Sequence, residues 1–293
     1  MKKVTVGLCV KNNGRTIGEA VMGILNQDFP HDLMEIVVVD GMSTDATLSI
    51  ITSCTARSDI QTRIFSDLGG GLGIARQIVV DRAVGQYIAW IDGDIVIPKK
   101  YLATQVSFLD GAQEVGAVQW NRVSYKGNSV AGALEVVSMN QVYNKKERRF
   151  LATRGAVYRV KAIKEVGGFD KNIKGACEDI DLSFRMWRMG WKLCINEGIW
   201  LHVPRESWKG LWDEYWWYGY GAHFIGDKHK GLIILWQWLP PMSLALGLRN
   251  SVPVYKLTQN KLAFLMPFNY LYKNLAWLFG FVKSHLDRYS YLD

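Results

Sequence analysis

The chain has 293 residues, of which 49% are hydrophobic and 21% are charged, and its formal net charge is +8. This length and composition are sufficient for one large or two small folded domains and exclude an intrinsically disordered chain. The four cysteines lie far apart, no Cys-x-x-Cys pair occurs, and no secretory segment precedes the first apolar run, so we expect a reducing compartment and no structural zinc.

Short apolar, β-branched runs alternate with longer amphipathic stretches through the first two thirds of the chain. The pattern predicts strands at 4–10, 35–40 and 87–91, helices at 15–26, 44–56, 72–84 and 178–189, and, where it loosens, a helix at 131–147 and a strand near 153–160. This order predicts an α/β fold with a mostly parallel sheet and helices on both of its faces. Such sheets bind ligands at the carboxyl ends of their strands.

Acidic residues follow two of the predicted strands. Asp92 and Asp94 come directly after the strand at 87–91, and Asp40 ends the strand at 35–40. An acid pair at a strand end suits a divalent cation that holds a diphosphate, although an isolated Asp-x-Asp also forms an Asx-type turn. The polar residues after Asp40 can cap the next helix, so the Asp40 carboxylate is predicted to be available for a ligand.

A glycine-rich turn at residues 69–76 reads GGGLGIAR and leads into a helix. Such a turn lets the backbone come close to a nucleotide diphosphate, and it places Arg76 for a bidentate contact with phosphate oxygens. A Rossmann dinucleotide site is the alternative for this motif. The turn follows a third strand and lacks the GxGxxG spacing, which argues against that alternative.

Residues 178–181 read EDID and place three acids at the start of a predicted helix. Three acids there could simply complement the helix dipole. Asp181 and Arg185 are spaced i,i+4, so we expect them to form a structural ion pair. The roles of Glu178 and Asp179 depend on the resemblance described next.

Together these segments resemble the family-2 inverting glycosyltransferases of the GT-A fold, over about residues 4–226. The segments that carry the resemblance are residues 10–17 with 24–27, 35–47, 69–76, 92–94, and 167–170 with 175–186. The resemblance implies a GT-A catalytic domain at residues 1–227. It would transfer a sugar from a nucleotide-diphosphate sugar, first UDP and second GDP, to a hydroxyl of a lipid-linked or polysaccharide acceptor.

The resemblance also implies roles for individual residues, which fall into donor-binding, metal-binding and catalytic groups. The donor-binding group comprises Val10, Asn12, Asp40, Gly71, Arg76 and Asp92. Asp94 would ligate Mg²⁺ or Mn²⁺ with Asp92 in support, and His202, at another strand end, is either a further metal-site residue or a packing residue. Asp179 would be the general base that deprotonates the acceptor, with Glu178 beside it positioning the acceptor.

One segment departs from the pattern. Residues 215–221 read YWWYGYG and lack the arginine that many relatives carry between the glycines. The chain also lacks the Gln-x-x-Arg-Trp segment of processive polysaccharide synthases. These differences argue against chain elongation and leave open whether this predicted loop contacts the diphosphate.

The composition changes after residue 227. No acid lies between Asp227 and Asp287, whereas seven lysines and arginines accompany the apolar runs at 232–248 and 262–282. Each run is near the ~20 residues that a spanning helix needs, but prolines and polar residues interrupt both. They could form short kinked spans, a re-entrant hairpin, helices in the interface or a soluble helical cap. We expect residues 228–293 to be helical and membrane-associated, with the catalytic domain at the cytoplasmic face.

Other functions remain as alternatives. A polyprenyl- or dolichyl-phosphate sugar synthase is similar in its catalytic half, but its phosphate acceptor needs no base, and the Glu178-Asp179 pair favours a hydroxyl acceptor. A nucleotidyltransferase would need a basic Gly-rich loop directly after the first strand, where this chain has KNNG at 11–14. A non-catalytic sugar-nucleotide-binding module is a remote alternative, and no nucleic-acid partner is expected because the basic residues cluster in the apolar C-terminal region.

Overall fold

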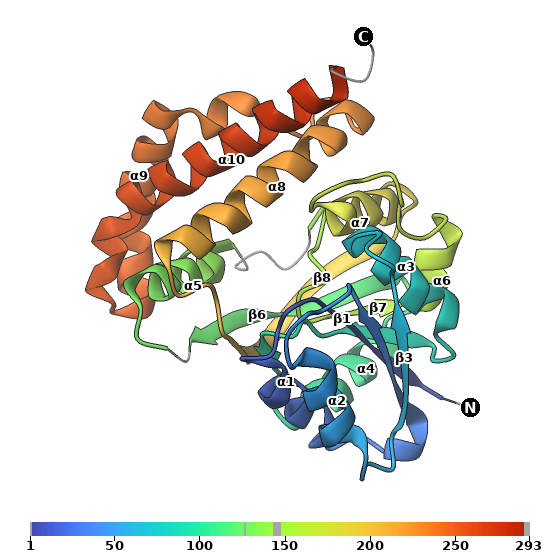
Figure 1. The fold of residues 1–293 in the computed structure, drawn as a ribbon. Helices are drawn as coiled ribbons and strands as arrows, with labels where there is room; N and C mark the ends of the chain where they lie inside the picture. The colour runs from blue at the N-terminus through green and yellow to red at the C-terminus, as the bar shows by residue number, and fades with distance from the viewer. Residues whose placement is uncertain (1, 126, 143–147, 290–293) are drawn as a thin grey trace. The chain divides into compact units, whose positions relative to one another are not determined.

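The computed structural model describes residues 2–125, 127–142 and 148–289, and the chain divides into two compact units (Figure 1). The first unit consists of residues 1–124, 143–171 and 178–202. The second consists of residues 125–142, 172–177 and 203–293. The predicted boundary at 227/228 falls in the last turn of a long helix of the second unit, α8 (Trp208–Lys228).

The first unit is built on one eight-stranded sheet with the spatial order β3-β2-β1-β4-β7-β6-β8-β5. The strands are β1 (Val4–Val10), β2 (Met34–Asp40), β3 (Gln61–Ser66), β4 (Tyr87–Trp90), β5 (Ile95–Val96), β6 (Val115–Tyr125), β7 (Ala156–Arg159) and β8 (Lys192–His202). Strands β1 to β4 are parallel, whereas β7 runs antiparallel to both β4 and β6, and β5 runs antiparallel to β8. The α/β fold is confirmed, but the sheet is mixed and not mostly parallel as predicted. The sequence did not indicate the antiparallel strands β6 and β7 clearly, because the apolar alternation is weak in that region.

Helices cover both faces of the parallel half of the sheet (Figure 1). The helices of this unit are α1 (Ile17–Leu25), α2 (Thr47–Thr55), α3 (Leu72–Arg82), α4 (Tyr101–Gly111), α6 (Val160–Glu165) and α7 (Glu178–Arg188), with a 3-10 turn, η1 (His31–Leu33). All seven residues of β2 are buried, as expected for a strand covered on both faces. Gly7 in β1 allows α3 to approach, because a Cβ there would lie 2.8 Å from Val79 Cγ1 and 2.9 Å from the Trp90 ring.

The second unit is helical. It contains α5 (Val130–Val142), α8, η2 (Leu235–Trp238), α9 (Pro240–Thr258), η3 (Lys261–Leu265) and α10 (Met266–Tyr289). Thus the aromatic run at 215–221 lies in the middle of α8 and not in a loop. The Tyr272 hydroxyl donates to the Trp208 carbonyl, and His223 lies against His285, so α8 and α10 run parallel.

Glycines allow α8 and α10 to pack closely. A Cβ on Gly219 would collide with the Trp277 carbonyl, and a Cβ on Gly280 would collide with the Trp216 carbonyl. A buried ion pair joins α5 to the same helices, because Lys273 Nζ lies 2.8 Å from Glu135 Oε2, which also lies near the Tyr215 hydroxyl. Packing and ion pairing therefore hold three helices from distant parts of the sequence together.

The two apolar C-terminal runs are helical, as predicted. The first forms η2 and the beginning of α9, whose first two residues are Pro240 and Pro241, and the second forms η3 and most of α10. Polar residues such as Asn269 and Lys273 lie inside the second run and are buried. Among residues 2–125, 127–142 and 148–289, no helix is both long and apolar enough to cross a bilayer.

Candidate active site

Asp40 lies at the carboxyl end of β2, next to the end of β1, where its Cα is the register partner of Val10. The side chain is buried, and its Oδ2 accepts a hydrogen bond of 3.0 Å from the Ser43 backbone N–H. Its Oδ1 is also buried and has no hydrogen-bond partner among the described residues. A buried carboxylate oxygen normally has a donor, so this oxygen is suited to accept one from a ligand. Val10 is buried as well, so only its backbone can serve a ligand.

The loops that follow β1 and β2 are linked by hydrogen bonds. Asn12 adopts a positive φ of 52°, its N–H donates to Ser43 Oγ, and its side-chain oxygen accepts from the Thr44 N–H. The Asn13 N–H donates to Thr47 Oγ1 at 2.8 Å, and the Gly14 N–H donates to Asp45 Oδ2 at 2.9 Å. The two segments predicted to hold the nucleotide base and ribose thus form one connected loop pair.

The glycine-rich turn is shaped by Asp67, a residue that the sequence pattern did not single out. Its carboxylate accepts hydrogen bonds from the N–H groups of Gly69 and Gly71, and its carbonyl accepts one from Gly70. Gly71 has a φ of +94°, and a Cβ there would have open space around it. The turn therefore presents bare backbone at the start of α3, as binding of a diphosphate requires.

Asp92 and Asp94 lie in the turn between β4 and β5. The Gly93 carbonyl accepts a hydrogen bond of 2.6 Å from Thr16 Oγ1, which ties this turn to the loop after β1. Pairing of β5 with β8 sets Ile95 opposite His202 and brings His202 Nε2 to 3.7 Å from Asp94 Oδ2. The structure therefore brings Asp94 and His202 close together, and Asp92 lies in the same turn as Asp94.

The chemistry of this group suits a hard cation. Within the described ranges, no group of three or more His, Cys, Asp or Glu side chains is arranged to hold a metal ion by itself. Mg²⁺ is usually bound by one or two carboxylates, with the remaining ligands supplied by water and substrate phosphates. His202 is 2% exposed, and its Nδ1 is buried without a partner in the described part of the chain, so the residues present fit a cation that arrives with a diphosphate.

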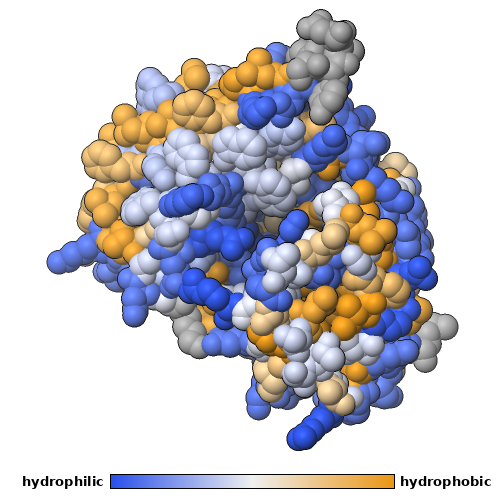
Figure 2. Space-filling model, viewed as in Figure 1, coloured by the Kyte–Doolittle hydropathy of each residue, from blue (hydrophilic) through white to orange (hydrophobic). Residues whose placement is uncertain are grey.

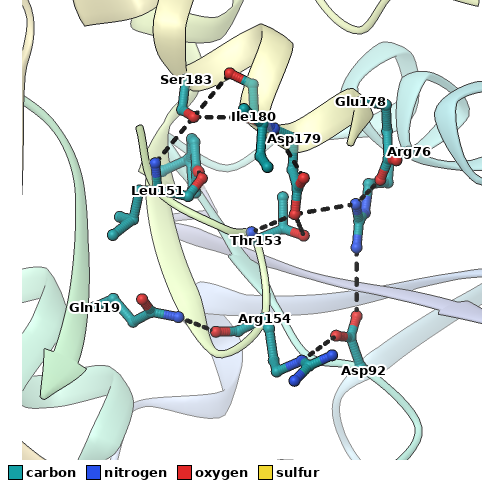
Figure 3. A network of polar contacts seen from close by, with 11 residues as sticks. Arg76, Asp92, Gln119, Leu151, Thr153, Arg154, Glu178, Asp179, Ile180 and Ser183 are labelled. Atoms are coloured by element: carbon teal, nitrogen blue, oxygen red, sulfur yellow. Dashed lines mark hydrogen bonds and ion pairs between the residues drawn. The ribbon is translucent and has the colours of Figure 1, made fainter. Parts of the chain in front are cut away.

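Arg76 is the centre of the polar network in Figure 3. Its guanidinium is 5% exposed and is hydrogen-bonded to Glu178. It also lies 3.7 Å from Asp179 Oδ2 and 3.6 Å from Asp92 Oδ1. One guanidinium thus faces two acids at the start of α7 and one acid after β4, which are far apart in the sequence.

The other carboxylate oxygen of Asp92, Oδ2, lies near a second arginine that the sequence pattern did not identify. Arg154 Nε lies 4.0 Å from Asp92 Oδ2, and the Arg154 carbonyl accepts a hydrogen bond from the Gln119 side chain (Figure 3). Arg154 lies in the segment just before β7, which no motif marks. Tertiary structure alone brings it to the site.

Asp179 and Glu178 differ in accessibility. Asp179 Oδ2 accepts hydrogen bonds from the backbone N–H and the Oγ1 of Thr153, at 3.1 and 3.3 Å, and its side chain is 16% exposed. Glu178 is 1% exposed. Asp181 forms the predicted i,i+4 ion pair with Arg185, at 2.7 Å. Of the three acids, Asp179 is therefore the one that presents its carboxylate to a ligand.

The surroundings of Asp92 raise its pKa. Burial raises the pKa of Asp92 above its ordinary value, Arg76 opposes this rise, and the nearby Asp94 carboxylate adds to it. Burial also raises the pKa of Cys9 to about 12, so its thiol stays protonated and is not a nucleophile at neutral pH.

The raised pKa of Asp92 makes its carboxylate destabilising in the protein without ligand. Below the unfolded-state pKa, Asp92 is protonated in both states and contributes nothing; as the pH rises through the folded-state pKa, stability is lost. We expect Asp92→Asn to raise the thermal unfolding midpoint at about pH 7 and to change it little at about pH 4. Differential scanning fluorimetry of metal-free protein measures this, and a lower midpoint at neutral pH would contradict it.

Comparisons with known proteins give matches to family models and to individual relatives. The model of the family described as Glycosyl transferase family 2 matches residues 5–167, and that of Glycosyl transferase family group 2 matches residues 87–283. The poly(ribitol-phosphate) β-N-acetylglucosaminyltransferase TarS of Staphylococcus aureus is 31% identical over 110 residues, which are 38% of this chain and 19% of TarS. The β-monoglucosyldiacylglycerol synthase of Synechocystis is 25% identical over 215 residues, 70% of this chain and 43% of the synthase.

Solved structures share the fold. The mannosyltransferase PcManGT of Pyrobaculum calidifontis, in complex with GDP-Man and Mn²⁺, is similar with a TM-score of 0.69 and 19% identity, over 97% of this chain and 87% of that one. A structure of S. aureus TarS in complex with UDP gives a TM-score of 0.55 and 18% identity, over 97% of this chain and 92% of that one. At these identities the likeness concerns the fold.

Proposed function

Because the chain belongs to glycosyl transferase family 2 and is a glycosyltransferase, we propose that it transfers a sugar by a single displacement at the anomeric carbon of a nucleotide-diphosphate sugar. The observation that carries this proposal is the Arg76 network. It gathers a donor-side acid, Asp92, and an acceptor-side acid, Asp179, around one buried cation. A single displacement needs side chains for the sugar donor and for the acceptor within one site.

In this mechanism Asp179 takes the proton from an acceptor hydroxyl. The oxygen then attacks the anomeric carbon from the face opposite the nucleotide, the bond to the diphosphate breaks, and the configuration inverts. Thr153 holds Asp179 by two hydrogen bonds, so the base is oriented before the acceptor binds. Glu178 acts through Arg76, which it holds between the two halves of the site.

On the donor side, Asp40 would accept a hydrogen bond from the base, and the Gly71 turn would lie against the diphosphate. Mg²⁺ or Mn²⁺, held by Asp94 with Asp92 and His202 nearby, would stabilise the charge on the departing diphosphate. The Arg76 guanidinium would also stabilise the charge on the departing diphosphate. We take a UDP-sugar as the first candidate donor and a GDP-sugar as the second; related folds were solved with UDP and with GDP-Man and Mn²⁺.

The proposed acceptor is a hydroxyl of a lipid-linked or polysaccharide glycan. Asp179 supports a hydroxyl over a phosphate, because a phosphate acceptor needs no base. Two relatives, one a poly(ribitol-phosphate) glycosyltransferase and one a glycolipid synthase, are compatible with such acceptors. Assays with lipid phosphate and with lipid-linked saccharide would separate the two acceptor classes.

A thermal-shift panel tests the donor site directly. UDP-, GDP- and dTDP-sugars are each added with and without Mn²⁺, and we expect one nucleotide class to raise the unfolding midpoint only when the metal is present. A ligand that binds the native state at about 100 times its Kd stabilises it by about 2.7 kcal/mol. Asp94→Asn should abolish the metal-dependent part of this shift. Absence of a metal-dependent shift with every donor would overturn the proposed site.

We also propose that the second unit binds the cytoplasmic surface of a membrane. The side chains of η2, η3 and α10 include large apolar residues with about half or more of their surface exposed, namely Trp236, Phe264, Phe268 and Phe279. The same unit carries exposed basic residues in this stretch of the sequence, namely Lys230, Arg249, Lys256 and Lys261. Figure 2 shows hydrophobic surface over the α9 side of this unit. Apolar side chains flanked by cations are typical of interfacial binding to anionic lipid.

Vesicle sedimentation checks this part of the proposal. We expect the protein to sediment with vesicles rich in anionic lipid and to do so much less with neutral ones. Replacing Trp236, Phe264 and Phe268 together by serine should reduce binding at least tenfold, because burial of each such side chain contributes about 1.5–3 kcal/mol. The matched control replaces exposed Met22 and Val84 of the first unit by serine. Equal binding of both variants would contradict the proposal.

A further inference from the structure

A basic and aromatic pocket lies on the first unit, at the end of α7 opposite the candidate base. It has a volume of about 280 Å³ and is lined by Arg148, Arg149, Trp187, Trp191 and Lys192. The Arg149 guanidinium lies over the Trp187 ring, 5.2 Å from its centroid, and Trp187 also stacks on Phe184. None of these residues belongs to the site proposed for the donor.

The charge and shape of the pocket indicate the class of its ligand. Three cations line it, and two indole side chains provide apolar surface, which suits a sugar ring that carries an anionic group. Its volume is just below the roughly 300–1,000 Å³ of pockets that hold whole drug-sized ligands, so one substituted sugar residue is a suitable size.

Two acids at the rim do not neutralise the pocket. Glu165 accepts a hydrogen bond from Trp191 Nε1 at 2.9 Å, and Glu114 lies 3.6 Å from Lys192 Nζ. In the second pair both side chains are about half exposed. Such surface pairs contribute about 0–1 kcal/mol, so a phosphate can compete for Lys192.

A continuous segment connects this pocket to the candidate base. Residues 149, 151 and 153 contact α7 at Trp187, Ser183 and Asp179 in turn. The Arg149 guanidinium lies over the Trp187 ring. The Leu151 N–H donates to Ser183 Oγ at 3.0 Å, and the Thr153 N–H donates to Asp179 (Figure 3). Two residues of extended chain advance about as far as four residues of helix, so the segment and the helix stay in register.

This register gives the distance from the pocket to the base. Asp179 and Trp187 are eight residues apart on α7, which corresponds to about 12 Å along the helix axis. A glycan held in the pocket could therefore present a hydroxyl to Asp179 only if it extends over a few sugar residues along α7. The acceptor proposed above, a lipid-linked or polysaccharide glycan, can have this length.

We propose that this pocket, which we call the α7 pocket, is a distal acceptor subsite that binds a phosphate-bearing residue of the acceptor glycan. It holds the chain of the acceptor while a residue nearer its end reacts at Asp179. This inference rests on the proposed glycosyl transfer, but binding in the α7 pocket can be measured without it. Arg149 and Lys192 supply charge, and Trp187 and Trp191 supply apolar surface against which the sugar packs.

Binding of defined probes tests the α7 pocket independently of catalysis. Microscale thermophoresis is performed with phosphorylated maltohexaose, neutral maltohexaose, inorganic phosphate and oligothymidylate. We expect the phosphorylated oligosaccharide to bind more tightly than the neutral one and than inorganic phosphate. The double variant Arg149→Ala/Lys192→Ala should weaken it at least tenfold, whereas the charge-matched control Arg57→Ala/Lys99→Ala should bind like the wild type.

Three outcomes of the oligosaccharide measurements would overturn the subsite. These are equal binding of phosphorylated and neutral oligosaccharide, an unchanged affinity in the pocket variant, and an equal loss in the control variant. Tighter binding of oligothymidylate that depends on Arg149 and Lys192 would also overturn it, because it would assign the α7 pocket to nucleic acid.

Kinetics then connect the α7 pocket to transfer. In the pocket variant, KM for a long phosphorylated acceptor should rise about tenfold, while KM for the donor and the rate of donor hydrolysis by water stay unchanged. An unchanged acceptor KM contradicts the subsite alone. Absence of both transfer and donor hydrolysis in the wild type contradicts the proposed function, while the binding results still decide whether the pocket recognises phosphate.

Discussion

Replacing Asp179 by asparagine is expected to lower kcat for sugar transfer by about 10²–10⁴-fold, the usual contribution of a positioned general base. Asparagine has nearly the same shape and can still accept a hydrogen bond from the Thr153 N–H, so the loop before β7 should stay in place. The affinity for the donor should therefore change little. Stopped assays of transfer to a hydroxyl acceptor, together with a thermal-shift titration of the donor, measure both quantities.

Glu178→Gln is the matched variant for this experiment. Glu178 is buried against Arg76, so we expect its substitution mainly to reduce stability and to lower kcat less than Asp179→Asn does. Full turnover of Asp179→Asn with intact donor binding would disprove the base assignment. A phosphate acceptor would then become the preferred reading, because such an acceptor is already ionised.

Replacing Arg76 by methionine is expected to have the largest effect on stability. Arg76 is 5% exposed and is the cation that Glu178, Asp179 and Asp92 share. Removal of one partner from a buried ion pair destabilises a protein by about 3–5 kcal/mol, because a buried charge is left uncompensated. In a domain of this size the unfolding midpoint should fall by about 10 °C. Chemical denaturation with urea measures the change in free energy of unfolding.

Two further variants separate charge from geometry at this position. Arg76→Lys keeps the charge but cannot reach three carboxylates at once, so its stability should lie between those of the wild type and Arg76→Met. Arg57→Met removes an exposed arginine and should change stability by less than about 0.5 kcal/mol. An Arg76→Met protein as stable as the Arg57→Met control would show that the network in Figure 3 does not hold the two halves of the site together.

The parallel half of the fold could be predicted from the sequence because periodicity and burial agree there. Strands β1, β2 and β4 are apolar runs that are buried on both faces, and Asp40 and Asp92 follow from their positions at or just beyond strand ends. The antiparallel half could not be predicted in the same way. Its strands β6 and β7 pair with partners distant in the chain, and no local pattern marks those partners.

Some of the candidate site residues could be predicted from the sequence, but the residues that contact them could not. The sequence pattern singled out Arg76 for a diphosphate contact, but it contained no sign that the guanidinium would lie between three carboxylates. Thr153 and Arg154 reach the site from a segment without a motif, so only the folded chain reveals them. Asp67 was in principle recognisable, because an acid just before a run of glycines often accepts hydrogen bonds from the turn that follows.

The C-terminal region illustrates a different limit. The apolar runs correctly predicted helices, but composition alone did not reveal that Gly219 and Gly280 permit contact between α8 and α10, or that Lys273 is paired with Glu135. The aromatic run at 215–221 was expected to be a loop, but it lies within α8. Within α8 those glycines instead permit close backbone approach between helices.

The hydrogen bonds between the loops after β1 and β2 affect how the donor binds. Four backbone N–H groups, those of Asn12, Asn13, Gly14 and Thr44, donate across the two loops. Loops that are ordered beforehand lose little conformational entropy when a ligand arrives. The nucleotide end of the donor should therefore bind with a small entropic penalty, so that differences in affinity between nucleotides arise mainly from the contacts made by the base.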